Sequence, residues 1–363
     1  MARNNILVIR FTALGDVAML APVVKQAAQQ SPDAEFTVLS RPFCQPLFEG
    51  LAPNVHFIGA DPKKDYQGIR GLYRLFRQLH EQHFSLICDC HDVLRTKVLR
   101  LFFRLYGYRI RTINKHRRLR KLITAPEGKK QLQQLPTSFQ NYAEVLGALS
   151  RPDGHPFLRS SRCSGTSWNP LEGQGAIQLA HSPEVVHSSG ILAKAPVALG
   201  IAPFAAHKGK IYPAPLMERV IAMLSTQKPD STIYLFGGKG KEEEQMRRWA
   251  AAYPNVKLAA DSCHGLADEL QLMRSLTVML SMDSANMHLA SLVGTPVVSI
   301  WGATHPYAGF LGWQQSLDDC IQLDMPCRPC SIYGNKPCHK GADYPCLQHI
   351  KPEMVVQRII RHF

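Results

Sequence analysis

Short apolar runs alternate with longer amphipathic segments along almost the whole chain. In the first half, strands are expected at residues 6–11, 35–40, 55–59, 86–89 and 108–113. In the second half, strands are expected at residues 197–201, 232–236, 256–258, 277–280 and 297–300. The segments between these runs have the length and periodicity of helices. Strands that alternate with helices in this way predict the α/β class, with doubly wound parallel sheets.

The alternation breaks between about residues 151 and 194, which are rich in Ser, Gly, Pro and His. Within this stretch only residues 176–180 resemble a strand. We therefore expect two Rossmann-like domains that face a cleft, the first at residues 1–180 and the second at residues 190–350. The apolar spacing near the C-terminus predicts a last helix within residues 351–363.

The composition is that of a protein large enough for two cores, with 363 residues and 45% hydrophobic content. We see no export signal before the first strand and no apolar run long enough to span a membrane, so we expect a cytoplasmic location. The ten cysteines are then expected to be mostly reduced. In the tail, Cys327-x-x-Cys330, Cys338 and Cys346 have a spacing that can hold zinc, but a second Cys-x-x-Cys is missing, and we expect no metal.

Positive charge is concentrated in one part of the chain, whose net charge is +14. Residues 95–130 contain 13 Lys and Arg and one acid, Glu127, which gives a net charge of +12. Such a segment indicates a local face for an anionic ligand or surface. A nucleic-acid-binding protein is one alternative, although no recognition motif accompanies the cluster. A second alternative is a charged face that is simply solvated and binds no ligand.

The segment from residue 277 to residue 306 reads as a strand, a helix and a second strand. Asp283 or Ser284 is expected to cap this helix, and Gly294 to end it. The helix start lies at the carboxyl end of a parallel strand, where doubly wound folds bind ligands. Its free N–H groups, with His288 one turn further on, suit a phosphate. The alternative is a simple cap and a satisfied polar residue on a helix.

This segment resembles the donor-binding motif of glycosyltransferase family 9, the heptosyltransferase family. The motif is Asp-(Ser/Thr)-(Gly/Ala)-x-x-His, followed by Gly-x-Pro and Gly-x-Thr. The matching residues are Asp283, Ser284, Ala285, His288, Gly294, Pro296, Gly302 and Thr304. The first turn, Thr12-Ala-Leu-Gly15-Asp16, is similar to the opening of the same family, and Asp89-x-x-x-x-x-Arg95-Thr96 resembles a third family motif.

The resemblance implies a GT-B type enzyme that transfers heptose, or a related sugar, with inversion and without a metal or other cofactor. The donor would be ADP-heptose, and the acceptor a lipopolysaccharide core or lipid A at the inner face of the cytoplasmic membrane. Nucleic acid is not an expected partner. Asp16 would be the catalytic base, with a helix N-cap as its competing role. The last helix would pack back on the first domain. A transferase of the same fold that uses another nucleotide sugar is the alternative.

The resemblance and the local chemistry together give two sets of binding residues. The donor set is Lys210, Lys239, His264, Asp283, Ser284, Ala285 and His288. The acceptor set is Thr12, Gly15, Arg95, Arg117, Arg118 and Arg120. Lys210 precedes a Pro-started helix, where a cation can reach a diphosphate, although a solvated surface lysine is equally compatible with the spacing. The basic, aromatic-laced face suits both the acidic acceptor and an anionic bilayer.

Overall fold

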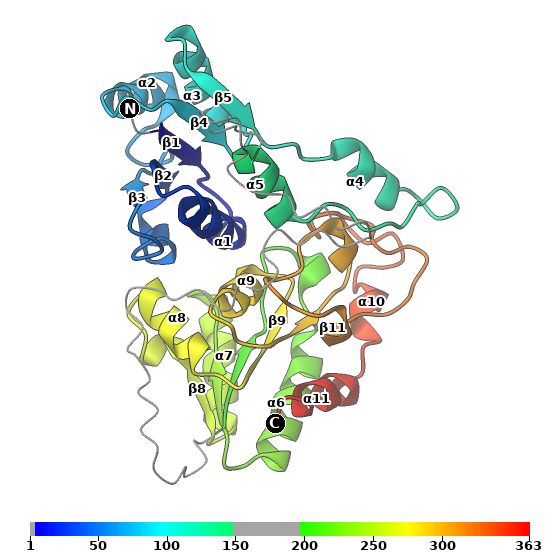
Figure 1. Ribbon diagram of the computed structural model, residues 1–363. Coiled ribbons are helices and arrows are strands. Elements are labelled where there is room, and N and C mark those ends of the chain that lie inside the picture. The colour runs from blue at the N-terminus through cyan, green and yellow to red at the C-terminus, as the bar shows by residue number, and fades with distance from the viewer. Residues whose placement is uncertain (1–3, 148–196) are drawn as a thin grey trace. The chain divides into compact units, whose positions relative to one another are not determined.

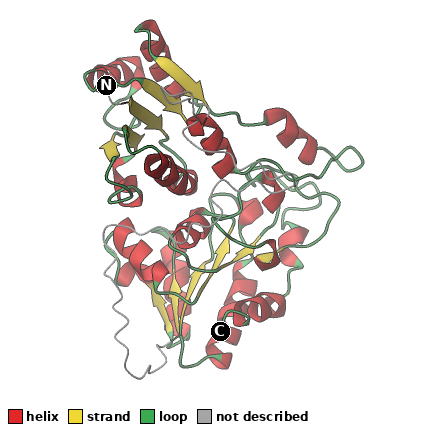
Figure 2. Ribbon diagram, viewed as in Figure 1, coloured by secondary structure: helices red, strands yellow, loops and turns green. Residues whose placement is uncertain are grey.

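The structure is a computed structural model that describes residues 4–147 and 197–363 (Figure 1). The expected linker at residues 151–194 and its strand-like run lie outside the described residues. The described residues fall into two compact units, one made of 4–115 with 136–147 and the other of 116–135 with 197–363. Each unit contains one sheet with helices packed against it (Figure 2).

The first unit is a five-stranded parallel sheet in the order β3-β2-β1-β4-β5. Its strands are β1 (Asn4–Ile9), β2 (Ala34–Ser40), β3 (Val55–Gly59), β4 (Leu86–Asp89) and β5 (Arg109–Thr112). Its helices are α1 (Leu14–Gln30), η1 (Pro42–Leu47), α2 (Gly68–His80), α3 (Leu94–Leu105) and α5 (Ser138–Gly147). The strand order reverses between β1 and β4, which makes this the topological switch point of the sheet.

The second unit is a six-stranded sheet in the order β11-β10-β9-β6-β7-β8, again parallel. Its strands are β6 (Ala198–Ala202), β7 (Thr232–Leu235), β8 (Val256–Leu258), β9 (Val278–Met282), β10 (Val297–Ile300) and β11 (Cys320–Ile321). Its main helices are α6 (Ala214–Gln227), α7 (Lys241–Ala252), α8 (Leu266–Arg274), α9 (Ala285–Leu292), α10 (Pro345–Gln348) and α11 (Pro352–Ile360). Short 3-10 turns are η2 (Lys208–Lys210), η3 (Ala259–Asp261), η4 (Pro306–Ala308) and η5 (Leu317–Asp319). Here the order reverses between β6 and β9.

All ten expected strands are present. The signal is strongest for the central strands, because a central parallel strand is buried on both faces and its sequence is almost continuously apolar. In β1, Leu7 and Ile9 are completely buried, and they pack with Phe76 and Phe103 from the covering helices. Strand β11 was not expected, because it consists of two residues only.

The expected first domain, residues 1–180, is interrupted. Residues 116–135, which include α4 (Arg117–Ile123), belong to the second unit. Arg120 donates to the Tyr333 hydroxyl at 2.6 Å, and its guanidinium carbon lies 5.3 Å from the centre of the Phe310 ring. These contacts bury the stem of a long basic side chain between aromatic rings, which periodicity alone does not reveal.

The last helix packs in the second unit, and its expected packing on the first domain stays a prediction. Val355, Val356 and Ile359 of α11 are buried in the core of the second unit. Glu353 forms an ion pair with Arg219 of α6 at 3.0 Å. The helix therefore completes the core of the unit in which it lies, because its apolar face fits beside α6. Among the described helices, none is both long enough and apolar enough to cross a membrane.

Candidate functional site

The two strongest donor-site residues meet at the switch point of the second unit. Strands β6 and β9 are neighbours, and the strand order reverses between them, so their carboxyl ends lie where doubly wound folds bind ligands. Lys210 follows β6 and Asp283 follows β9. Lys210 Nζ lies 2.9 Å from Asp283 Oδ2, and the two side chains are 15% and 3% exposed. The structure thus joins two motifs that are far apart in the sequence.

Glycines allow the backbone to pack closely around Lys210. The carbonyl of Gly209 accepts a hydrogen bond from the Ala303 N–H at 2.8 Å. A Cβ atom at Gly302 would lie 2.7 Å from the same carbonyl oxygen, and one at Gly334 would lie 2.6 Å from Lys210 Cγ. Gly334 also has a φ of +72°, a conformation that favours glycine. These positions admit only glycine, and they fix the lysine stem so that its ammonium group reaches Asp283.

Helix α9 begins directly after this ion pair. Ser284 occupies the N-cap position, but its hydroxyl lies 3.2 Å from Ser281 Oγ, and among the described residues no side chain caps the helix. The N–H groups of its first turn, which starts at Ala285, can therefore serve an anion. His288 lies one turn along and is buried. The expected end of the helix is confirmed, since Gly294 follows Val293 with a φ of +87°.

A buried arginine that the sequence interpretation missed holds the Gly302-x-Thr304 loop. Arg328 donates to the carbonyls of Gly302 at 2.5 Å, Trp301 at 3.1 Å and Thr304 at 3.0 Å. Burial lowers the pKa of Arg328, so these carbonyl contacts take the place of the lost water. Arg328 lies within the Cys327-x-x-Cys330 run, whose spacing suggests metal binding and gives no sign of a buried arginine.

The remaining donor-set residues lie at the same edge of the sheet but outside this cluster. Lys239 is exposed in the turn after β7, where Gly238 N–H donates to Glu242 at 2.7 Å. His264 is exposed after β8, and its backbone N–H donates to the Asp268 carboxylate at 2.8 Å. The described contacts do not join either side chain to the Lys210–Asp283 pair. Both are open to solvent at the carboxyl ends of neighbouring strands.

A second polar cluster occupies the switch point of the first unit, between β1 and β4. Arg10 lies 2.7 Å from Asp16 Oδ2, with side-chain exposures of 9% and 27%. The other end of the Arg10 guanidinium donates to the Cys90 carbonyl at 2.6 Å. Burial lowers the pKa of Arg10, but Asp16 and Tyr142 raise it by more. The sequence analysis assigned no role to Arg10. A charged residue directly after an apolar strand could, however, have indicated a residue at the carboxyl edge of the sheet.

Asp16 is not the N-cap of α1, which corrects its competing role. The N-cap is Ala13, and Asp16 is the third helical residue, whose carboxylate accepts the Ala13 N–H at 3.2 Å. The Tyr142 hydroxyl donates to the Asp16 backbone carbonyl at 3.2 Å. Gly15 is buried beside it in the first turn. The carboxylate therefore has a local structural role and remains partly open to solvent.

His91 joins the same cluster from the β4 side. Its Nε2 atom lies 3.2 Å from the hydroxyl oxygen of Thr12, one of the expected acceptor residues. Burial, reinforced by the charges of Arg10 and Lys115, lowers the pKa of His91 to about 3. The imidazole is therefore neutral at physiological pH. Sequence reasoning placed this residue in a motif without assigning it a role.

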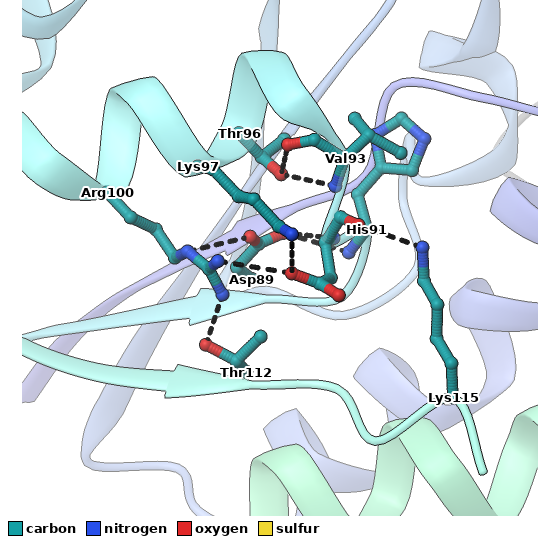
Figure 3. A network of polar contacts seen from close by, with 9 residues as sticks. Asp89, His91, Val93, Thr96, Lys97, Arg100, Thr112 and Lys115 are labelled. Atoms are coloured by element: carbon teal, nitrogen blue, oxygen red, sulfur yellow. Dashed lines mark hydrogen bonds and ion pairs between the residues drawn. The ribbon is translucent and has the colours of Figure 1, made fainter. Parts of the chain in front are cut away.

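Asp89, the first residue of the third family motif, is held in a network of polar contacts (Figure 3). It is fully buried, and one carboxylate oxygen accepts the N–H groups of His91 at 2.9 Å and Asp92 at 3.0 Å. Arg100 bridges the two acids, 3.3 Å from Asp89 and 3.1 Å from Asp92. This network fixes the loop from which α3 starts. Arg95, another expected acceptor residue, is exposed in the first turn of that helix.

The acceptor set is divided between the units. Thr12, Gly15 and Arg95 belong to the first unit, whereas α4 carries the remaining three arginines in the second unit. Arg117 and Arg118 are exposed, but Arg120 is held by Tyr333 and Phe310. Among the described residues, no group of His, Cys, Asp and Glu has the arrangement of a metal site.

Comparison with known proteins gives a consistent result. Residues 171–338 match the sequence model of glycosyltransferase family 9 (heptosyltransferase). Among curated protein sequences, none matches the chain significantly. The fold is similar to that of E. coli ADP-heptose lipopolysaccharide heptosyltransferase II, with a TM-score of 0.65, 17% identity and coverage of 99% of this chain and 98% of that chain.

Two further solved structures are similar over the whole chain. E. coli heptosyltransferase WaaC with ADP has a TM-score of 0.64, 16% identity and coverage of 99% and 100%. A family 9 glycosyl transferase from Veillonella parvula has a TM-score of 0.69, 18% identity and coverage of 100% and 98%. The likeness confirms the predicted fold class, two parallel-sheet α/β domains of the GT-B type. The chain carries a domain of glycosyltransferase family 9, and the protein is a glycosyltransferase.

Proposed function

We propose that this glycosyltransferase transfers heptose, or a closely related sugar, from ADP-heptose to the inner core of a lipopolysaccharide acceptor. The observation that carries the proposal is the Lys210–Asp283 ion pair at the β6–β9 switch point, with the uncapped start of α9 directly behind it. Two solved structures of E. coli heptosyltransferase WaaC support the donor class, since one is described with ADP and the other with ADP-2-deoxy-2-fluoro heptose.

The donor diphosphate would be held by charge and by backbone N–H groups. Lys210 supplies the cation, and α9 supplies first-turn N–H groups with the positive end of the helix dipole. Asp283 keeps the ammonium group in place before the donor arrives. As the glycosidic bond to the diphosphate breaks, these groups would stabilise the negative charge on the leaving group. We propose that no divalent metal is needed for this work.

Inversion requires a base that takes the proton from the acceptor hydroxyl as that oxygen attacks the anomeric carbon. We propose that Asp16 is this base. Its carboxylate is partly exposed beyond the carboxyl end of β1, 2.7 Å from the Arg10 guanidinium. Arg117 and Arg118 would bind the acidic groups of the acceptor, at the inner face of the cytoplasmic membrane.

Calorimetry with ADP, UDP, GDP and CDP, followed by transfer assays with the matching sugar donors, tests the proposal. We expect binding of ADP and transfer from ADP-heptose, with an α-linked product from a β-linked donor or the reverse. Preference for another nucleotide would establish the alternative, a transferase of the same fold with a different donor. Binding to duplex DNA without affinity for any nucleotide would reject the proposed function.

A further inference from the structure

A cavity of about 200 Å³ opens in the second unit, beyond the carboxyl ends of β10 and β11. Its apolar lining comes from two parts of the chain. Leu323 and Met325 follow β11 and pack against the core, and Leu132 belongs to the stretch that follows α4. That stretch is held in place, since the Leu135 N–H donates to the Tyr307 carbonyl at 2.8 Å. The apolar walls are therefore fixed by the fold.

His305 lines the same cavity and is only 8% exposed. Its Nδ1 atom accepts the Tyr307 N–H at 3.1 Å, so the ring proton lies on Nε2. Burial, reinforced by the charge of Arg328, lowers the pKa of His305 to about 4, and the imidazole is neutral at pH 7. Within residues 4–147 and 197–363, the Nε2–H group has no hydrogen-bond partner. The cavity thus contains a neutral donor that the protein itself does not use.

Two further polar groups complete the lining. The Gln322 side-chain oxygen accepts from Arg328 at 3.0 Å, so the amide NH₂ of Gln322 remains as a second donor. Asp324 is exposed, and in the described part of the chain its carboxylate has neither a hydrogen bond nor an ion pair. Its charge acts on His305, so the two side chains lie near each other. The cavity therefore offers two neutral donors and one carboxylate acceptor.

This combination of groups selects the chemistry of the ligand. An anion would need a free cation, but Arg328 and Lys130, whose charges act on His305, both donate to backbone carbonyls. Asp324 would in addition repel an anion. A hydrocarbon would leave the donors unpaired, which is costly. A sugar satisfies every group, because its hydroxyls both donate and accept while its C–H groups contact apolar side chains.

We propose that this cavity binds one neutral sugar ring of a glycan. Neighbouring hydroxyls of the ring donate to Asp324 and accept from His305 and Gln322. Pockets for drug-sized ligands measure about 300–1,000 Å³, so this smaller cavity suits a single ring rather than a whole nucleotide. The site goes beyond the proposed function, because it involves neither the sugar donor nor the reacting hydroxyl of the acceptor. It would hold a glycan at a sugar that takes no part in the transfer.

Saturation-transfer difference NMR on the full chain tests the proposal, with the methyl glycosides of mannose, glucose, galactose and a heptose as probes. We expect at least one of them to bind. His305→Phe keeps an aromatic ring without the donor, and Asp324→Ala removes a carboxylate that the described contacts of the fold do not use. Each variant should bind the sugar about tenfold more weakly or worse. Asp318 is an exposed acid just before β11, and the matched control Asp318→Ala should bind like the parent.

Circular dichroism checks the folding of each variant, and Asp324→Ala decides the test if His305→Phe unfolds. Absence of saturation transfer to all four glycosides would overturn the proposal and mean that the cavity holds only water. Equal sugar affinity in Asp324→Ala and the parent would also overturn it.

Two further measurements separate this site from the proposed donor site. Adenosine should not compete with the sugar, and ADP calorimetry should give the same affinity for Asp324→Ala and the parent. Competition by adenosine, or loss of ADP affinity in Asp324→Ala, would assign the cavity to the nucleotide and overturn the sugar site. A parent that binds the sugar but not ADP would reject the proposed donor and leave the sugar site standing.

Discussion

Asp16 combines two tasks at the residue scale. Its carboxylate accepts the Ala13 N–H, and it is the counter-ion of the nearly buried Arg10. A substitution at Asp16 therefore affects the first turn of α1 and the charge balance of the switch point together. The Tyr142 hydroxyl donates to the backbone carbonyl of Asp16, so removing this hydroxyl leaves the Asp16 carboxylate in place.

Replacing Asp16 with Asn should lower the turnover number by about 100-fold or more, since the amide cannot take a proton from the acceptor. Stability should also fall by about 1–3 kcal/mol, because Arg10 loses a charged partner while the cap oxygen is kept. Transfer assays and urea unfolding measure the two quantities. Tyr142→Phe is the control, with near-parental turnover expected. If Asp16→Asn keeps parental turnover, Asp16 is not the base.

Lys210 allows a matched test of the donor site, because Lys208 lies in the same 3-10 turn and is exposed. Lys210→Gln should weaken ADP binding by about 1.5–3 kcal/mol, the range for hydrogen bonds to charged groups, whereas Lys208→Gln should leave the affinity unchanged. The paired substitution Lys210→Gln with Asp283→Asn should recover stability without recovering affinity. Equal losses for the two lysines in calorimetry would mean a general charge effect.

His91 should make the protein sensitive to acid. Burial lowers its folded-state pKa to about 3, below the unfolded value of about 6.5, so protonation favours the unfolded state. This contribution is fully present above pH 6.5 and is lost progressively down to about pH 3, by at most about 1.4 kcal/mol per pH unit. When urea unfolding is measured at several pH values, the free energy of unfolding of the His91→Gln variant should depend less on pH than that of the parent. His207 is exposed, so the control variant His207→Gln should keep the pH dependence of the parent.

At the scale of elements, α4 shows how the contacts of one side chain can hold a segment against a unit. Arg120 is fixed by Tyr333 and Phe310, and Lys130 donates to the Pro329 carbonyl at 3.0 Å. Arg117 and Arg118 remain on the exposed side of the helix. The basic cluster therefore contains a structural anchor, Arg120, as well as exposed basic side chains, and a test of the proposed binding must leave the anchor unchanged.

The triple substitution of Arg117, Arg118 and Lys121 by Gln should weaken binding to anionic liposomes, by about 1 kcal/mol for each basic residue near the surface. Hydrolysis of free donor should not change, because none of the three is in the donor set. Arg120→Gln should instead lower the melting temperature, since it removes a structural contact. Loss of DNA binding with unchanged liposome binding in the triple variant would contradict this assignment.

At the scale of the whole molecule, each unit has its own sheet and its own core, and the tail completes the second one. Cys346 lies in that core, and burial raises its pKa to about 11, so its thiol is protonated at neutral pH. Burial also raises the pKa of Cys330. A metal would have to displace these protons before it could bind.

We therefore expect the purified chain to contain less than about one zinc or iron per molecule and to keep its transferase activity in EDTA. Elemental analysis and activity measured before and after chelation check this expectation. A stoichiometric metal, with unfolding or loss of activity on chelation, would identify the four tail cysteines as a structural metal site.

The sequence alone determined ten of the strands, most clearly the central ones, because a strand buried on both faces is apolar almost throughout. Together with the family resemblance, it also indicated the candidate residues Asp16, Lys210 and Asp283, charged residues in the segments that follow apolar strands. The start of α9 was likewise expected from the sequence. All of these are local signals, readable within a dozen residues.

Only the tertiary structure decided which distant residues meet. The Lys210–Asp283 pair, the Arg10–Asp16 pair beside His91 and the Arg328 contacts all join loops that the strand order brings together. The placement of α4 and α11 in the second unit depended in the same way on side-chain packing. Hydrophobic periodicity reports whether a face is buried, but it contains no information on the surface that covers it.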